Sequence, residues 1–291
     1  MSEENGKTST GYHMGTVDTV ISVDDVNAQA RRMAEPVTIE TIGSLAGNDP
    51  YLAISGLRAG YGKMEILHSF DLQVAKGQSL CLIGPNGAGK STILHSIFGF
   101  TNIFDGTITI RDGKGGRRDV THMTSNRKLR EAGIAYILQD KSVFPGMTVE
   151  ENLWMGGYLM DTPAQAREAA ERVFARYDRL AQRRKHQAKV LSGGERRLLE
   201  ISRALVMNPE VLLVDEPSIG LEPRFIDMVF EILDDLQTAE GKTIIMVEQN
   251  AKKGLEFADI GYVLVSGQLA MAGLGDELLE DPEVGRLFLG G

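Results

Sequence analysis

Short apolar runs recur along the chain from residue 51 onward, and most of them end in a turn or a polar motif. Three of these runs lie within SLCLI (79–83), VLLVDEP (211–217) and KTIIMVEQN (242–250), and they are almost continuously apolar. Continuously apolar strands are typical of a parallel sheet that is covered on both faces. The pattern therefore predicts a buried sheet that includes these three strands.

The remaining pattern adds further strands and at least two helices. Residues 162–187 are charged and have helical periodicity, and KSTILHSIFGF (90–100) also has helical character after a glycine-rich loop. Alternation of buried strands with helices predicts an α/β fold. Other strands are expected at 51–61, on either side of a polar turn within 69–84, at 106–112, and twice within 259–279 before a helix start.

The first fifty residues differ from the rest of the chain. They carry eight acidic residues against three basic ones and contain almost no aromatic residues. Such a segment buries too little apolar surface to offset the entropy of ordering it. We expect a flexible or loosely packed extension, with a regulatory module as the alternative. Two apolar patches, at 17–23 and 37–42, could dock on the domain or on a partner.

Composition excludes several classes of protein. The chain has 291 residues and a net charge of −9, which argues against a nucleic-acid-binding protein. Its one cysteine, Cys81, excludes an internal disulfide framework and fits a reducing compartment. No apolar run approaches the ~20 residues that span a bilayer, and the N-terminus lacks a secretory pattern. These features predict a cytoplasmic protein that reaches a membrane only through a partner.

A phosphate loop is the first motif with chemistry. GPNGAGKST fits the pattern G-x-x-x-x-G-K-[ST], follows an apolar strand and opens a helix. Backbone N–H groups and the helix N-terminus can cradle phosphate oxygens, Lys90 can reach the β- and γ-phosphates, and the Ser91 hydroxyl can ligate magnesium. The expected nucleotide-binding residues are Gly84, Pro85, Asn86, Gly87, Ala88, Gly89, Lys90, Ser91 and Thr92.

An acidic pair follows the second buried strand. Asp215 and Glu216 stand between four apolar residues and a proline. Asp215 suits a role in holding magnesium, directly or through water. Glu216 suits the base that orients and deprotonates an attacking water. A solvated pair at a strand end is the alternative, and the phosphate loop upstream favours the catalytic interpretation.

LSGGE at 191–195 lies between these two motifs, immediately before an expected helix at 195–205. Ser192, Gly193 and Gly194 would form a second anion-binding helix N-terminus. Ser192 also suits an ordinary N-cap, and both roles use the same N–H donors. One chain cannot easily bring both helix ends onto a single phosphate group.

The order and spacing of these motifs resemble the ATP-binding subunit of an ABC transporter over about residues 51–291. The resemblance implies a RecA-like P-loop NTPase core, in which helices flank a parallel sheet, with an antiparallel β-subdomain and an α-helical subdomain at about 146–192. It also implies ATP and Mg²⁺ as ligands. Two such domains would pair head-to-tail, each presenting its LSGG segment to the phosphate loop of the other.

Smaller motifs gain roles from the same resemblance. Tyr61 matches an aromatic residue that stacks on adenine, although simple packing is the alternative. Gln139, in YILQD, matches a glutamine that contacts magnesium and water and senses the membrane subunit. Residues 142–153 would lie near that membrane partner, and residues 218–223 would communicate across the dimer.

One position departs from the superfamily pattern. A histidine usually follows the strand that here reads TIIMVEQN, and this chain has Gln249 there. We expect Gln249 to take the catalytic, phosphate-sensing position. The five histidines, His13, His68, His95, His122 and His186, are expected at the surface or in packing, because none lies near a motif that would replace the missing one.

Finer details resemble one branch of the superfamily. VEQNA, FPGMTVEENL and the terminal LFLGG resemble an ATPase subunit of branched-chain amino-acid importers; importers of urea and short-chain amides are the near alternative. The resemblance implies membrane permease partners, indirectly a periplasmic solute-binding protein, and a peripheral place on the cytoplasmic face of the inner membrane. A soluble non-transport ABC ATPase and a non-hydrolysing nucleotide-binding adaptor are alternatives of another class.

Overall fold

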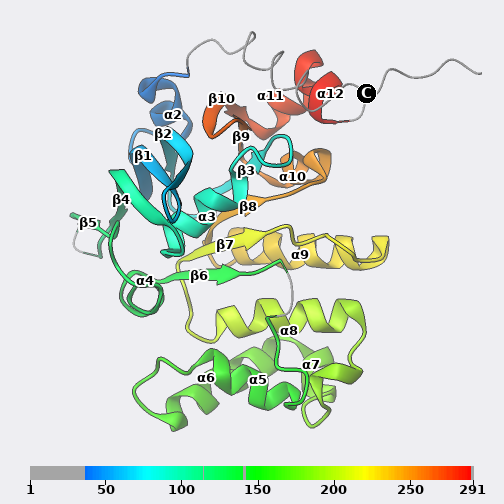
Figure 1. The fold of residues 1–291 in the computed structure, drawn as a ribbon. Coiled ribbons are helices and arrows are strands. Elements are labelled where there is room, and N and C mark those ends of the chain that lie inside the picture. The colour runs from blue at the N-terminus through cyan, green and yellow to red at the C-terminus, as the bar shows by residue number, and fades with distance from the viewer. Residues whose placement is uncertain (1–36, 114, 140–141, 290–291) are drawn as a thin grey trace, which may run out of the picture.

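Two sheets and a layer of helices form the protein in a computed structural model, which describes residues 37–289 apart from 114 and 140–141 (Figure 1). The larger sheet has six strands in the order β10-β9-β3-β8-β7-β6, and only β10 runs antiparallel to its neighbour. Its strands are β3 (Ser79–Ile83), β6 (Ile134–Ile137), β7 (Val211–Asp215), β8 (Thr243–Val247), β9 (Ile260–Val265) and β10 (Gln268–Leu274).

Burial explains why this sheet forms from those runs. Every residue of β3, β7, β8 and β9 is buried, so these strands have no solvent-facing side and need no alternating pattern. One face packs against helices α9 (Pro223–Thr238) and α10 (Ala251–Phe257). The three central strands expected from the sequence are confirmed, and β6 is an edge strand that the sequence reading did not assign.

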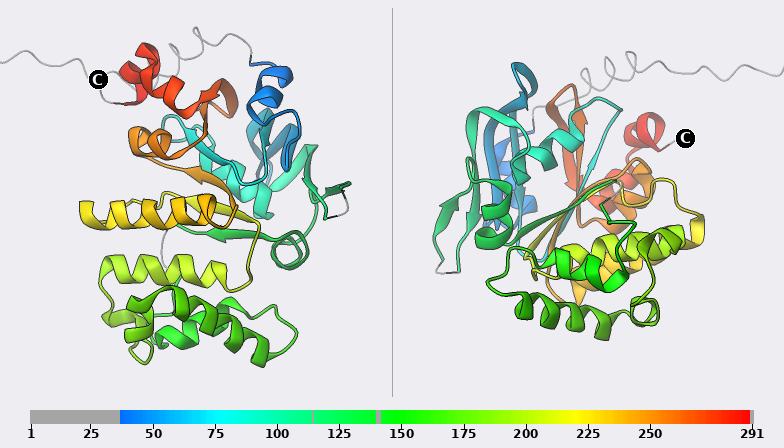
Figure 2. Two further views of the ribbon diagram at one scale, coloured as in Figure 1. Left: turned by 180° about the vertical axis from the view of Figure 1, so that it is seen from behind. Right: turned by 60° about the horizontal axis from the view of Figure 1, so that its bottom comes forward.

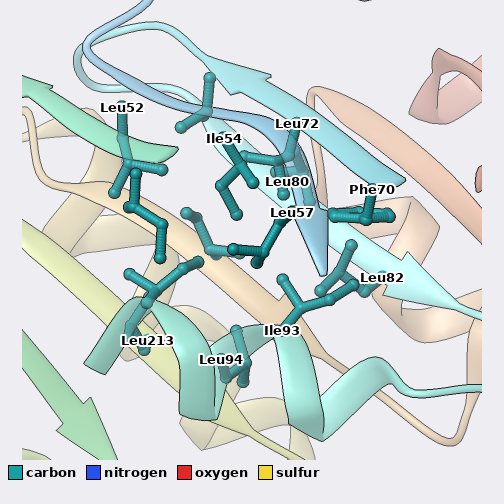
Figure 3. Close-up of a cluster of buried hydrophobic side chains, with 14 of the residues drawn as sticks. Leu52, Ile54, Leu57, Phe70, Leu72, Leu80, Leu82, Ile93, Leu94 and Leu213 are labelled. Atoms are coloured by element: carbon teal, nitrogen blue, oxygen red, sulfur yellow. The ribbon is translucent and has the colours of Figure 1, made fainter. Parts of the chain in front are cut away.

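The smaller sheet is antiparallel, with the order β2-β1-β4-β5, and covers the other face together with helix α3 (Lys90–Phe98). Its strands are β1 (Leu52–Tyr61), β2 (Met64–Val74), β4 (Asn102–Arg111) and β5 (Arg117–Asp119). Figure 3 shows side chains from both sheets and from α3 converging in one core: Leu57, Phe70, Leu80, Leu94 and Leu213. This core holds α3 in place, and with it the end of the phosphate loop, from which α3 begins.

The helical layer has a hydrophobic cluster of its own, from Val143 to Val206. The helical layer consists of α5 (Val149–Gly156), α6 (Pro163–Arg176), α7 (Asp178–Gln182), a short 3-10 turn (Ala188–Val190) and α8 (Gly193–Leu205). These helices lie together at one end of the molecule (Figures 1 and 2). The cluster takes in α8, beyond the 146–192 segment expected for the helical part.

The segment 162–187, expected to be helical, is not one helix. It breaks at Tyr177, and residues 183–187 run back along the start of α5. There the N–H groups of Val149 and Glu150 donate to the carbonyls of His186 and Arg184 at 2.9 and 3.1 Å. The first N–H groups of a helix need outside acceptors, and a continuous helix could not supply these carbonyls.

The remaining helices complete the edges. Helix α4 (Ser125–Ala132) precedes β6, while α11 (Gly275–Glu280) and α12 (Pro282–Phe288) follow β10. Among the described residues, no helix combines the length and apolar character needed to cross a bilayer.

Part of the first fifty residues is helical. Helix α2 (Ile39–Leu45) begins after Thr38, whose side chain accepts a hydrogen bond from the Thr41 N–H, and it contacts β2 and β10. Ile42 is 1% exposed and belongs to the main core. The apolar patch at 37–42 therefore packs on the domain through Ile42 and, in part, Val37, while Ile39 is exposed. The patch at 17–23 lies outside the described residues.

Candidate functional site

The phosphate loop connects the end of β3 to the start of α3 in a backbone that requires glycine. Gly84 and Gly89 have φ values of 142° and 100°, in the region that side chains disfavour. A Cβ at Gly84 would come within 2.3 Å of the Leu264 carbonyl oxygen. The loop is thus held against β9, and α3 begins with Lys90 and Ser91.

Lys90 folds back onto its own loop. Its side chain is 7% exposed, and Nζ donates to the carbonyl oxygens of Gly84 and Pro85 at 2.8 and 3.1 Å. Burial lowers the pKa of the ammonium group, while the carboxylates of Glu216 and Asp215 oppose this shift. The cation is therefore held at the loop with acidic groups nearby.

Asp215 accepts a hydrogen bond on each of its carboxylate oxygens. The Ser91 hydroxyl donates to Oδ1 at 3.0 Å, and the Tyr136 hydroxyl donates to Oδ2 at 2.6 Å. Burial raises the pKa of Tyr136 well above its usual range, and the charge of Asp215 adds to this, so the hydroxyl stays protonated. The structure brings Ser91 and Asp215 together as the sequence suggested.

Tyr136 is not among the site residues predicted from the sequence. It lies on β6, and β6 pairs with β7 in parallel register that joins Ile137 to Val214. The local sequence gives one hint of a role for Tyr136: it is a polar-tipped residue in an apolar strand, three residues before Gln139. The partnership with Asp215 depends on strand order, which the sequence does not state.

Glu216 has an unusual backbone at the end of β7. Its φ is 43°, left-handed for a residue with a side chain, and its N–H donates to the Val247 carbonyl at 2.8 Å. The Gln139 amide donates from Nε2 to Glu216 Oε2 at 2.7 Å. Burial, followed by the charge of Asp215, raises the pKa of Glu216. The carboxylate is therefore a stronger base than an ordinary glutamate.

The end of β8 supplies the neighbouring groups. Glu248 is 2% exposed and accepts from the Ser218 hydroxyl at 2.7 Å and from the Asn250 N–H at 2.9 Å. It ties the loop after Glu216 to β8, a role that the sequence reading did not give it. Gln249 is exposed. It lies two residues after Val247, whose carbonyl accepts the hydrogen bond from the Glu216 N–H.

The LSGGE segment begins α8 in the helical layer. Ser192 and Glu195 form a reciprocal cap, in which each side chain accepts from the other's backbone N–H at 3.2 and 2.9 Å. Gly194 is buried, and a Cβ there would come within 2.1 Å of the Phe225 ring. Gly193 is exposed, so one glycine serves packing and the other presents a bare backbone to solvent.

Arg197 links α8 to the strand end that carries Gln139. Its guanidinium is 4% exposed, and Nη1 donates to the Leu138 carbonyl at 2.8 Å and to Glu200 at 3.0 Å. A cavity of about 610 Å³ lies beside this link, lined among others by Gln139, Gly193 and Leu221. The phosphate loop and the LSGGE segment start helices that belong to different hydrophobic clusters. Helix α3 packs in the main core, and α8 packs in the helical layer.

Tyr61 lies at the end of β1, 43% exposed. Its hydroxyl forms a hydrogen bond with His95 Nδ1, on the helix that the phosphate loop opens. His95 was expected at the surface or in packing, and it is half-buried among aromatic rings. His13 lies outside the described residues.

The fold and site together define a phosphate-loop ATPase. Residues 67–219 match the family described as ABC transporter. The chain belongs to this family, as one of its ATP-hydrolysing subunits.

Several known proteins are similar along most of their length. BraG of Pseudomonas aeruginosa, a high-affinity branched-chain amino acid transport ATP-binding protein, is 39% identical over 79% of this chain and 96% of its own. A probable branched-chain amino acid transport ATP-binding protein, LivF of Archaeoglobus fulgidus, is 37% identical over 80% and 96%.

Solved structures agree with this assignment. The ADP conformation of the ATP-binding cassette MJ1267 has a TM-score of 0.71 at 28% identity, over 83% of this chain and 99% of that one. A nucleotide-free cassette from an ABC transporter gives the same score and identity over 83% and 100%. The RecA-like core with its antiparallel and helical parts is thus confirmed.

Proposed function

We propose that this chain hydrolyses ATP to power the import of branched-chain amino acids through membrane partner subunits. The observation that carries the proposal is the similarity to BraG, 39% identity over 96% of that protein's length, in a chain with a complete phosphate site. The motif VEQN, with Gln249 in place of a histidine, supports the same branch.

Phosphate binding belongs to residues 84–92. The loop N–H groups and the start of α3 cradle the phosphates, and Lys90 neutralises their charge. In binding, the Lys90 ammonium exchanges its bonds to the Gly84 and Pro85 carbonyls for phosphate oxygens. Tyr61 receives the adenine ring on its exposed face.

Magnesium fits the paired hydroxyl and carboxylate of Ser91 and Asp215. Their oxygens are 3.0 Å apart, and hard oxygen donors suit this ion, which usually binds one or two carboxylates plus substrate phosphates. Gln139 is the third candidate ligand. The ion would neutralise charge on the phosphates. Groups of three or more His, Cys, Asp or Glu arranged for a metal do not occur in the described part of the chain.

Hydrolysis needs a base, and Glu216 takes that role. Its carboxylate accepts a proton from water as the water oxygen attacks the γ-phosphorus, and ADP leaves with the electrons of the broken P–O bond. The Gln139 amide at 2.7 Å orients the carboxylate. Gln249 donates from its amide to the γ-phosphate, where an imidazole usually stands.

A second ATPase subunit, identical or paralogous, completes each site from outside. Ser192 and Gly193 are exposed at the start of a 13-residue helix whose layer is separate from the phosphate loop. A head-to-tail pair brings this helix N-terminus onto the partner's ATP. Because ATP would contact both subunits only in the closed pair, it binds that state more tightly and shifts the equilibrium toward closure.

The closing motion reaches permease subunits at the cytoplasmic face of the inner membrane. Residues 142–153 lie next to Gln139, and Phe144 in that stretch is 40% exposed. This surface suits an apolar contact with a membrane partner. A periplasmic binding protein would deliver the solute, which this chain does not touch.

Reconstitution tests the proposal. The chain would be purified with its permeases, placed in vesicles and supplied with the binding protein and ATP, and uptake of labelled leucine would be compared with that of urea and acetamide. We expect leucine uptake that Glu216→Gln abolishes. Uptake of urea or acetamide alone would replace the solute assignment, and ATP hydrolysis without uptake of any solute would favour a non-transport ATPase.

A further inference from the structure

The hydroxyl of Tyr61 is held by a residue distant in the sequence. It forms a hydrogen bond with Nδ1 of His95, 34 residues away. Tyr61 ends a strand, and the residue is 43% exposed. An exposed ring held only at its base can turn about its side-chain torsions, and a bond at its far end removes that freedom.

His95 is itself fixed by packing. Its ring meets Tyr61, Phe100 and Tyr136 edge-on, with centroid separations of 6.0, 5.8 and 5.7 Å. It lies on α3, four residues after Ser91, which is about one helical turn. The group that holds Tyr61 is therefore part of the rigid helix that begins in the phosphate loop.

We infer that His95 is a positioning residue for the nucleotide base: through the Tyr61 hydroxyl it holds the ring that stacks on adenine at a fixed place relative to the phosphate loop. The inference rests on the proposed function, because it takes Tyr61 as the ring that receives the base. The ligand class is a purine nucleoside triphosphate, whose base and phosphates are both located from α3.

The expected effect concerns the base alone. Ordering a free side chain on binding costs about 0.5–1.5 kcal/mol, which corresponds to about a 2- to 12-fold change in affinity. A prepositioned Tyr61 avoids this cost when the ligand carries a base. Inorganic triphosphate binds the same loop without a base, so it gains nothing from His95.

The test measures dissociation constants of Mg-ATP and of magnesium triphosphate for the full chain. We expect His95→Leu to weaken ATP binding about 2- to 12-fold and to leave triphosphate binding unchanged. Tyr61→Phe, which keeps the ring and loses the hydroxyl, should match it, and the double variant should be no weaker. His95→Asn should restore binding, because the asparagine Oδ1 can stand near the position of Nδ1. His68→Leu is the matched control and should change neither constant.

Four results would overturn the inference, and they have different meanings. If His95→Leu weakens ATP and triphosphate equally, the histidine only supports α3. If Tyr61→Phe binds ATP like the wild type, the hydroxyl bond does not position the ring. Tyr61→Ala distinguishes the role of Tyr61 from that of His95. If this variant leaves the ratio of ATP to triphosphate affinity unchanged, Tyr61 does not stack on adenine. If the ratio changes but His95→Leu has no effect, only the role of His95 is wrong.

Discussion

The Tyr136 hydroxyl donates a 2.6 Å hydrogen bond to Oδ2 of Asp215, on the strand next to its own. Hydrogen bonds to ionised groups contribute more than neutral ones, about 1.5–3 kcal/mol. This bond fixes the plane of a carboxylate whose other oxygen accepts from Ser91. Tyr136 therefore acts on the proposed metal site through Asp215.

Tyr136→Phe removes this bond with little change in shape. Partners that orient a metal-binding group typically change affinity or activity by 10- to 100-fold, and we expect half-maximal turnover to need about 10-fold more Mg²⁺. A magnesium titration of ATP hydrolysis measures this. Tyr262→Phe is the control, since it removes another buried hydroxyl that bonds Gln73 at 3.3 Å, and it should leave the magnesium requirement unchanged.

Glu216→Gln should keep ATP affinity, lower turnover by at least ~10²-fold and favour an ATP-bound dimer, because the amide cannot accept the proton from water. Lys90→Ala should instead weaken binding, because it removes a charge from the phosphates. Equilibrium binding and single-turnover hydrolysis separate these effects. Near-normal hydrolysis by the glutamine variant would remove Glu216 from the role of base.

The turnover of the wild type should also depend on pH through Glu216. A carboxylate acts as a base only when ionised, so activity falls as the pH drops through its pKa. Burial and the charge of Asp215 raise that pKa. The acid limb should therefore lie at higher pH than an ordinary glutamate gives, as a pH profile of kcat/KM for Mg-ATP, which reports the groups of the free enzyme, would show. A limb at the ordinary position would contradict this.

The two glycines of the LSGGE segment should respond differently to alanine. Gly194→Ala forces a Cβ to within 2.1 Å of the Phe225 ring and should destabilise the fold by about 1–3 kcal/mol. In Gly193→Ala the nearest atom is Leu221 Cδ2 at 3.8 Å, which is ordinary contact, so stability should hold. Turnover should nevertheless fall at least ~10-fold in the Gly193 variant, because the added methyl meets the partner's ATP.

Thermal unfolding and turnover, measured side by side, check this contrast. A Gly193→Ala protein that is stable and hydrolyses ATP at the wild-type rate would mean that this glycine faces no phosphate.

Gln249→Ala should slow turnover more than it weakens ATP binding, because its amide bond matters most as charge develops. Gln249→His should introduce a pH limb between about 6 and 7, since imidazole gains a proton there and an amide does not. Turnover against pH for the three proteins decides the matter. An alanine variant as fast as the wild type would leave Gln249 as a strand-end residue only.

Ile42 joins α2 to the main core, and its truncation should be costly. Ile42→Ala should lower the free energy of unfolding by about 2–5 kcal/mol. Ile39, on the same helix and 62% exposed, is the control, and its alanine variant should change stability by less than about 0.5 kcal/mol. Urea unfolding measures both. Equal effects would show that the burial of Ile42 does not distinguish it from the exposed Ile39, because alanine improves helix propensity equally at both positions.

Local motifs could be predicted and long-range partnerships could not. The phosphate loop, the acidic strand end and LSGGE follow from adjacent residues, and their strands and helices lie where the pattern placed them. Tyr136, His95 and Glu248 gain their roles from partners 79, 34 and 30 residues away. Such pairs depend on strand order and helix packing, and the non-helical course of residues 183–187 is tied to acceptors for α5 that only the folded chain reveals.

The left-handed backbone of Glu216 places conformational strain at the residue proposed as the base. A side chain at φ 43° costs on the order of 1–3 kcal/mol that the rest of the fold must offset. Glycine would adopt this conformation freely. Replacing Glu216 by glycine would therefore relieve the backbone and remove the proposed base in one step, so stability and the proposed chemistry oppose each other at this position.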